Sequence, residues 1–334
     1  MCYALPGPRC SSHASKAFTT AKVAYAQDPN DLNRAALIAA KEDYLTTPAG
    51  ISDLQTRGKS ELAEKHQALR QAKIDELKAI EDRTHGLKWS SIGLKEMDPG
   101  ALTQALHEAS TDPTIDWGDS SREDFLRAIN HATFLHRAQT RANRAGFPRT
   151  PYIEHPLRNT LRLYRWTCTS GEVLTASVLH DTVEDCAEEM SGGETDPLRA
   201  RIIAEEKVYE MYSPSVGRIV SGTSNPILPK GTPREKKVKS YLSHLQENLY
   251  DPDVFATKVA DFGDNAGGLH HNLIPGQERM VTNMTVKYSQ AQPIFEDSLR
   301  STENLPFMSI YPVTRSLERT GERLRLLRDE LNLH

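Results

Sequence analysis

Hydrophobic positions recur with a period near 3.6 residues along most of this chain, and the strict alternation that is typical of strands is scarce. The pattern predicts an all-α protein. Ser120 or Ser121 is expected to cap a helix that runs through Leu135, because Glu123 and Asp124 suit the first turn of a helix. Further helices are predicted over residues 156–168, 173–187, 198–211, 213–222, 234–249, 253–266 and 277–300.

The first part of the chain has a different character. Residues 1–16 are rich in Pro, Gly and Ser, and two helices over 17–45 and 53–82 are expected to be broken by the residues at 47–50. The second helix has a narrow apolar stripe, which indicates a helical hairpin or a coiled-coil arm for a homo-oligomer or a partner protein, although a solvated packing helix is the simpler interpretation. The stripe consists of Leu62, Leu69, Ile74, Leu77 and Ile80.

Linkers are expected at Asp98-Pro99-Gly100 and at Asp112-Pro113. The predicted organisation is therefore an N-terminal helical arm of unknown role over 1–115, a main domain over 116–305, and an amphipathic C-terminal helix over 306–334. The apolar side of that last helix carries Leu317, Leu324, Leu327 and Leu331.

Composition narrows the class of protein. The formal net charge of −4 gives no nucleic-acid signature, and no apolar run approaches the length of a membrane span. The first residues lack the pattern of a secretory signal, so a cytoplasmic protein is expected. Four widely spaced cysteines are interpreted as reduced thiols; a zinc site that uses Cys2, Cys10 and His13 is disfavoured because no fourth ligand is evident.

The segment from Leu179 to Asp185 concentrates one imidazole and three carboxylates directly after an apolar run. Burying so much unpaired charge is unfavourable, and a divalent metal is a suitable counter-charge. If the segment is helical, His180 and Glu184 share one line along it, and Asp181 and Asp185 share the next.

Two other residues suit the same metal. His155 lies in the segment Pro151-Tyr-Ile-Glu-His-Pro156, and Asp261 ends an apolar run, with Asn265 one turn later. Each alone has a plainer interpretation, as a helix-start histidine or a solvated helix end. Together with His180 and Asp181 they predict a site of two His and two Asp, which suits Mn²⁺, Fe²⁺ or Zn²⁺ better than Ca²⁺.

Glu184 and Asp185 remain beside this metal as non-ligands. Hydrolysis needs a carboxylate to take or relay the proton of an attacking water, and this pair is placed for that task. The alternative is that they only pair with neighbouring basic residues.

The ordered motifs resemble the hydrolase domain of the RelA/SpoT alarmone enzymes, an HD-type metal-dependent phosphohydrolase domain, and in particular the small alarmone hydrolases. The resemblance covers residues 125–300 and implies an HD-domain helical bundle. The matching motifs are His136-Arg-Ala-Gln-Thr-Arg141, Gly146, Pro151-Tyr-Ile-Glu-His-Pro156, Leu179-His-Asp-Thr-Val-Glu-Asp185, Val220-Ser-Gly-Thr-Ser224 and Lys258-Val-Ala-Asp-Phe-Gly-Asp-Asn265.

The resemblance implies roles for individual residues. His155, His180, Asp181 and Asp261 would bind Mn²⁺, and Glu184 and Asp185 would be catalytic. Arg141 would contact the base and Asn265 the sugar or phosphate. The implied reaction removes the 3′-pyrophosphate of ppGpp or pppGpp, which could also neutralise a toxic alarmone synthetase. His136 and Gln139 are assigned to packing and local hydrogen bonds.

The chain also departs from the family. The turn at 146–150 is longer, and Ala142 replaces a basic residue for which Arg144 is expected to compensate. The residues Phe262-Gly-Asp264 and Ala266-Gly-Gly268 replace substrate-contacting motifs. Alarmone synthesis is not expected, because no nucleotidyl-transfer domain is recognised.

Two alternatives remain open. One is another HD phosphohydrolase that acts on nucleoside monophosphates, dNTPs or NADPH. The other is a non-enzymatic antitoxin that binds a partner protein through the N-terminal helices, against which the intact Glu184–Asp185 pair argues.

Overall fold

Helices dominate the computed structural model, which describes residues 11–27, 37, 40–41, 44–45, 48–68, 71, 92–142, 149–301 and 305–333. The all-α prediction is confirmed. Contacts divide the chain into two compact units, Met1–His85 and Gly86–His334. None of the helices in the described ranges is long and apolar enough to span a membrane.

The first unit contains α1 (Ser11–Gln27) and α3 (Pro48–Thr56). The predicted break at 47–50 is the start of α3, because proline suits the first turn of a helix. The predicted helix over 53–82 is interrupted at Gly58, whose φ of +69° is a left-handed conformation, before helix resumes at 60–68. Of the expected stripe, Leu62 is exposed, and the other four positions lie outside the described residues, as do Cys2 and Cys10.

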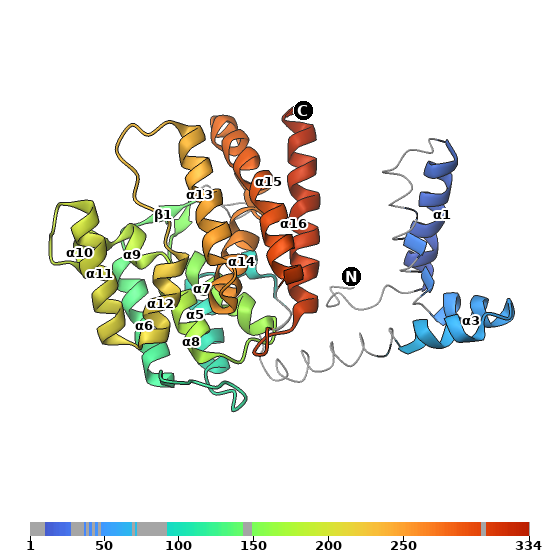
Figure 1. Ribbon diagram of the computed structural model, residues 1–334, viewed down its shortest axis with the longest axis horizontal. Coiled ribbons are helices and arrows are strands. Elements are labelled where there is room, and N and C mark those ends of the chain that lie inside the picture. Colours follow the sequence, from blue (N-terminus) through green and yellow to red (C-terminus); the bar gives the residue numbers. More distant parts are fainter. Residues whose placement is uncertain are drawn as a thin grey trace. The chain divides into compact units, whose positions relative to one another are not determined.

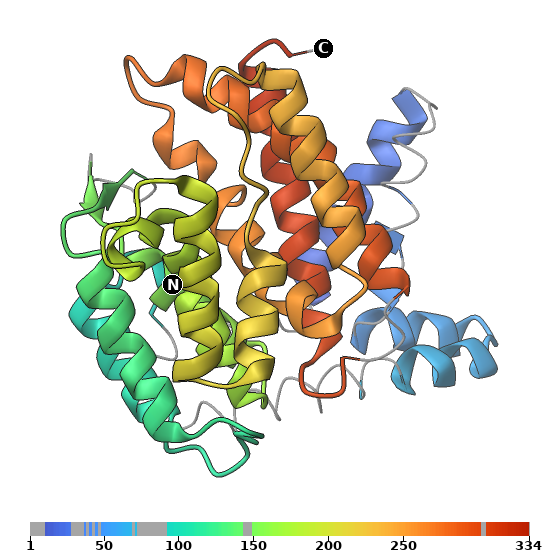
Figure 2. The ribbon, with the colours of Figure 1, turned by 60° about the vertical axis from the view of Figure 1, so that its left-hand side comes forward.

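The second unit carries the remaining elements (Figures 1 and 2). Strands β1 (Thr140–Arg141) and β2 (Thr150–Pro151) pair antiparallel, and η1 (Leu94–Glu96) and η2 (Leu269–Asn272) are short 3₁₀ helices. The helices are α5 (Pro99–Ala109), α6 (Arg122–Leu135), α7 (Glu154–Arg165), α8 (Gly171–Leu179), α9 (Thr182–Asp185), α10 (Ala187–Met190), α11 (Pro197–Met211), α12 (Pro214–Thr223), α13 (Arg234–Asn248), α14 (Pro252–Asn265), α15 (Glu278–Ser301) and α16 (Ile310–Glu330).

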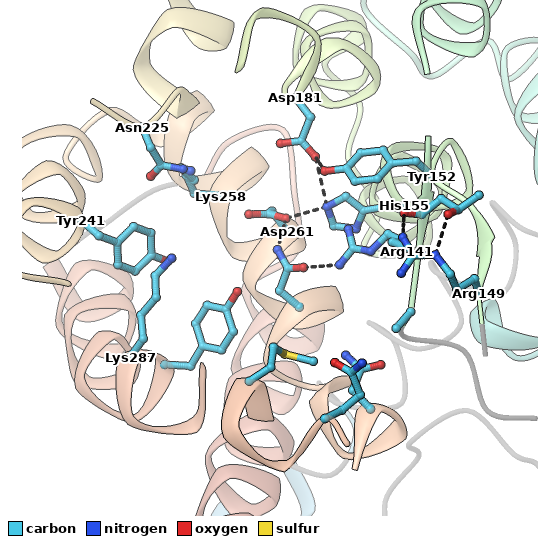
Figure 3. A pocket seen from close by; sticks show the side chains of 17 residues that line it. Arg141, Arg149, Tyr152, His155, Asp181, Asn225, Tyr241, Lys258, Asp261 and Lys287 are labelled. Carbon is cyan, nitrogen blue, oxygen red and sulfur yellow. Dashed lines mark hydrogen bonds and ion pairs between the residues drawn. The ribbon is translucent and has the colours of Figure 1, made fainter. Parts of the chain in front are cut away.

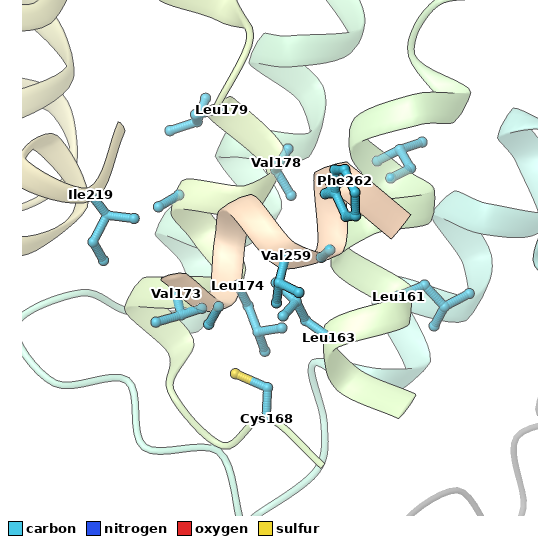
Figure 4. Packing of buried hydrophobic residues seen from close by; sticks show 14 of the residues in the cluster. Leu161, Leu163, Cys168, Val173, Leu174, Val178, Leu179, Ile219, Val259 and Phe262 are labelled. Carbon is cyan, nitrogen blue, oxygen red and sulfur yellow. The ribbon is translucent and has the colours of Figure 1, made fainter. Parts of the chain in front are cut away.

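Helix α14 is the central element of this unit, because it packs against α7, α8, α12 and α16. Its residues from Val254 to Ala260 are all buried, and so is every residue of α8 except Glu172. Figure 4 shows Val259 and Phe262 of α14 among the side chains of α7 and α8. Both helices therefore lie in the interior of the unit, and the site residues lie at or near their C-terminal ends.

The capping residue at the start of α6 is one of the two that the sequence predicted. Ser121 caps α6 by accepting a hydrogen bond from the backbone N–H of Asp124 at 3.0 Å. The linker expected at Asp98-Pro99-Gly100 is instead the start of α5, where the Asp98 carboxylate accepts from the N–H of Ala101 at 2.8 Å. Helix α5 buries Leu102 and Leu106 in the main core. The compact unit therefore includes residues that the predicted boundary at 115 assigned to the arm.

The helix predicted over 173–187 is three shorter pieces, α8, α9 and α10. At the end of α8, the Thr182 hydroxyl donates to the Leu179 carbonyl at 2.7 Å, and Nδ1 of His180 lies 2.8 Å from the Ser177 carbonyl. These side chains compete for carbonyls that a continuing helix would use. The resulting turn places His180 and Asp181 between two helices.

The C-terminal helix has the predicted apolar side. Leu317, Leu324 and Leu327 are buried, Leu331 is partly buried, and α16 runs alongside α15 in both ribbon views.

Candidate metal centre

Three separate elements bring two imidazoles and two carboxylates together, and Figure 3 shows three of these residues, His155, Asp181 and Asp261. His155 comes from the first turn of α7, His180 and Asp181 from the turn between α8 and α9, and Asp261 from α14. Nε2 of His155 lies 2.9 Å from Oδ1 of Asp261 and 3.5 Å from Oδ2 of Asp181. Nε2 of His180 lies 3.2 Å from Oδ2 of Asp181 and 3.6 Å from Oδ1 of Asp261.

This convergence has the composition of a metal site. One ligand atom each from His155, His180 and Asp181 lies within 4.8 Å of the others. Asp261 lies next to this group, because its Oδ1 atom is close to the Nε2 atoms of both imidazoles. Mixed imidazole and carboxylate donors suit a divalent transition metal.

Both imidazoles present the same nitrogen to the site. Nδ1 of His155 lies 2.8 Å from Oδ2 of Asp264, and Nδ1 of His180 is 2.8 Å from the Ser177 carbonyl. A carbonyl only accepts, so Nδ1 of His180 carries a proton, and Nε2 is the nitrogen left to bind a metal. That Nε2 is buried and makes no hydrogen bond to the described residues. An orphaned imidazole nitrogen between two carboxylates fits a metal ligand.

The electrostatics of the cluster also favour a cation. Burial alone would lower the pKa of His180, but Asp181 and Asp261 raise it well above its ordinary value. Burial alone would raise the pKa of Asp261, but the two imidazoles hold it well below its ordinary value. The carboxylates therefore stay ionised and seek positive charge, which a divalent metal would supply in place of protons.

Neighbouring side chains orient the two carboxylates. The Tyr152 hydroxyl donates to Oδ2 of Asp181 at 2.7 Å, and Nδ2 of Asn265 donates to Oδ1 of Asp261 at 2.6 Å. Nη2 of Arg141 in turn donates to Oδ1 of Asn265 at 2.6 Å. The predicted substrate residues Arg141 and Asn265 thus join the metal residues in one hydrogen-bonded chain.

Asp264 is a part of the site that the sequence named only as a departure from the family motif and not as a functional residue. It is fully buried and pairs with cations from α7 and η1 as well as with His155. Its oxygens lie 2.9 Å from Nε of Arg158, 3.0 Å from Nη2 of Arg162 and 2.9 Å from Nζ of Lys95. The i, i+4 spacing of the two arginines was visible in the sequence, but nothing there indicated that they meet α14.

The predicted catalytic carboxylates lie beside the metal residues. Glu184 accepts hydrogen bonds from the backbone N–H of Asn225 at 2.7 Å and from its side chain at 3.1 Å. Asp185 reaches solvent, yet its packed surroundings and the charge of Asp181 raise its pKa to about 6. A carboxylate with a raised pKa is a more effective base near neutral pH than an ordinary one.

The other predicted residues are placed as follows. Nδ1 of His136 lies 2.7 Å from Oε1 of Gln139, a local hydrogen bond. Arg144 lies in 143–148, outside the described residues.

A cavity of about 450 Å³ opens over the metal residues. Its wall is rich in basic and aromatic side chains. The residues of this wall that the sequence did not propose as functional include Arg149, Asn225, Tyr241, Lys287 and Tyr288. The volume suits a small organic molecule, and the four basic residues that line the cavity suit an anionic one.

Comparison with known proteins gives one partial similarity. The chain is 33% identical over 127 residues to the zebrafish (Danio rerio) protein named guanosine-3′,5′-bis(diphosphate) 3′-pyrophosphohydrolase MESH1. The aligned part is 37% of this chain and 60% of that relative, so the chain spans less than two thirds of its length. No family model matches the chain.

Proposed function

We propose that this protein is an HD-type, metal-dependent phosphohydrolase that removes the 3′-pyrophosphate of guanosine alarmones. The observation that carries the proposal is the convergence of His155, His180, Asp181 and Asp261 with both Nε2 atoms turned inward. The partial similarity to a protein named as such a hydrolase supports the same chemistry.

The four residues would hold one divalent metal, with Mn²⁺ as the expected ion. When bound there, a metal lowers the pKa of water and withdraws charge from a phosphoryl oxygen. The Asp264 and Ser177 contacts keep the imidazoles oriented, and Tyr152 and Asn265 keep the carboxylates turned toward the same point.

The proposed reaction is a hydrolysis. The water oxygen bonds to the phosphorus next to the ribose, the bond from that phosphorus to the 3′-oxygen breaks, and the 3′-oxygen takes up a proton. Glu184 and Asp185 would accept and relay the proton that water loses. The products are GDP or GTP and pyrophosphate.

The nucleoside part of the substrate would lie toward Arg141 and Asn265. Arg141 lines the cavity, with its guanidinium 5.3 Å from the centroid of the Tyr152 ring. Arg149 lines the same part of the cavity and is fixed by hydrogen bonds to Thr140 at 2.7 and 2.6 Å.

A nucleotide panel with Mn²⁺ tests the proposal. The protein is incubated with ppGpp, pppGpp, their adenosine analogues, dNTPs and NADPH, and the products are separated by chromatography. We expect pyrophosphate and GDP or GTP from the guanosine alarmones, and no product after metal removal by a chelator. Release of no pyrophosphate from any alarmone would contradict the assignment.

The Glu184→Gln variant tests the proton acceptor. It keeps the size of the side chain but removes its basicity, so nucleotide affinity should persist while the rate falls by about 10²- to 10⁴-fold. Glu188→Gln is the matched control, because Glu188 is exposed in the adjacent α10. An equal loss of rate in both variants would mean that Glu184 has no specific role.

A further inference from the structure

Two lysines at one end of the cavity form no ion pair within the part of the chain that the structure describes. Lys258 of α14 is only 4% exposed, and Lys287 of α15 is half-buried. Among the described residues, neither ammonium makes a hydrogen bond or an ion pair. Arg141 and Arg149, at the other end, are already bonded to Asn265 and Thr140.

An ammonium group buried without a counter-charge is unfavourable, and two of them near one another are more so. The charges of Asp261 and Glu184 act to raise the pKa of Lys287, but neither carboxylate forms an ion pair with it among the described residues. Burial and the charge of Lys258 lower the pKa of Lys287 to about 8. An anion placed between the two ammonium groups would offset both the cost of burying them and their mutual repulsion.

The surroundings of Lys287 fix its position. Its Nζ lies 3.7 Å from the centroid of the buried Tyr241 ring and 5.4 Å from that of Tyr288. The ring faces hold the cation without neutralising it. Figure 3 shows Lys258, Lys287 and Tyr241 on one side of Asp261, opposite Arg141 and Arg149.

We propose that Lys258 and Lys287 bind the diphosphate group that the reaction removes, with Lys287 positioned by Tyr241. This deepens the proposed function and rests on it for the identity of the ligand. Lys258 lies one helical turn before Asp261, so a diphosphate on the two lysines has one phosphorus beside the metal residues. Two cationic groups match a diphosphate, whereas one would be enough for a single phosphate.

Inorganic pyrophosphate is the probe. It is titrated by calorimetry at pH 7 into the full chain freed of metal by excess chelator. We expect binding that Lys287→Met weakens by about ten- to a hundredfold, the equivalent of one charged hydrogen bond, and that Lys287→Arg largely restores. Lys239→Met is the control, because Lys239 is exposed on α13, the helix that carries Tyr241.

Thermal melting of the Lys258→Met variant distinguishes an anion-binding lysine from one that only stabilises the fold. Because it removes a buried, unpaired charge, this variant should melt at a higher temperature than wild type without ligand, yet gain less stabilisation from pyrophosphate. A lower melting temperature together with unchanged pyrophosphate binding would contradict the proposal.

Other outcomes separate this inference from the proposed function. Wild-type affinity in Lys287→Met, no binding by wild type, or orthophosphate binding as tight as pyrophosphate would each overturn the diphosphate site, even if alarmones are hydrolysed. Pyrophosphate binding that depends on both lysines would uphold the anion site even if no alarmone is cleaved, and would then leave the proposed function alone in error.

Discussion

Asp264 meets Arg158, Arg162, Lys95 and His155 inside the molecule. Burial alone would raise the pKa of its carboxyl group, but the charges of Arg158 and Lys95 hold that pKa well below its ordinary value. Asp264 therefore stays ionised and fixes Nδ1 of His155, which turns Nε2 toward the metal residues. One carboxylate thus links the stability of α7 and α14 to the geometry of the centre.

The Asp264→Asn variant tests this link. It removes the negative charge that neutralises the buried cations around position 264, so the free energy of unfolding should fall by about 3–5 kcal/mol. Metal affinity should fall by about 10- to 100-fold, because the imidazole is no longer oriented. Urea unfolding and metal titration measure the two effects. Asp297→Asn, which alters an exposed pair with Arg300, should change stability by less than about 0.5 kcal/mol. Unchanged metal affinity in folded Asp264→Asn would contradict the orienting role.

Lys287 gives the site a dependence on pH. Its pKa of about 8 means that the free protein loses this ammonium charge as pH rises through that value. The groups that face it are Lys258, Asp261, Glu184 and the phenols of Tyr241 and Tyr288, whose raised pKa values keep them neutral there. The KM for an alarmone should therefore rise between about pH 7 and pH 9. In Lys287→Arg, which stays charged, the profile should be flatter, and parallel profiles would exclude this lysine as the cause.

At the scale of elements, the turn between α8 and α9 decides where His180 and Asp181 lie. Thr182 is fully buried, and its hydroxyl closes the turn on the Leu179 carbonyl. Thr182→Val keeps the shape but leaves that carbonyl unpaired, which should cost about 1–3 kcal/mol and weaken metal binding. Thr285→Val removes a similar buried hydroxyl bond within α15 and should affect stability alone. Equal metal affinity in both variants would mean that the turn is held by other contacts.

The sequence predicted the elements whose signal is local. The apolar runs of α8 and α14 stood out because most of their residues are buried. The cap of α6 was narrowed to Ser120 or Ser121 from the neighbouring residues alone, and the structure shows that it is Ser121. The sequences around Pro48 and Asp98 were interpreted as a helix break and a linker, but both are helix starts. Proline ends a helix when it lies inside one, yet it suits the first turn of the next. The turn at His180 was missed because it depends on which carbonyls the Thr182 and His180 side chains reach.

The metal residues could be proposed from order and spacing, but their supports could not. Asp264 is 106 residues from Arg158 and 169 from Lys95, and only packing brings these charges together. Lys287 and Tyr241 lie on neighbouring helices, and their contact depends on how α13 meets α15.

At the scale of the whole molecule, the division at His85 and Gly86 predicts which part folds alone. Removing residues 1–85 should leave cooperative melting and metal binding intact. Removing residues 1–115 also removes Leu102 and Leu106 of α5, each worth about 2–5 kcal/mol when deleted from a core, so this shorter chain should fail to fold or melt much lower. Thermal unfolding followed by circular dichroism compares the two truncations, and equal melting would place the boundary at 115.

The metal centre also has a consequence for the order of events in refolding. The residues proposed to bind the metal lie as far apart as 155 and 261 in the chain, whereas each helix forms from neighbouring residues. Closing such a long loop is slow compared with helix formation. Ellipticity should therefore return first after dilution from denaturant. The visible absorption of a Co²⁺ ion bound by His155, His180, Asp181 and Asp261 should return later. Its rate would then measure the final packing of α14 against α7.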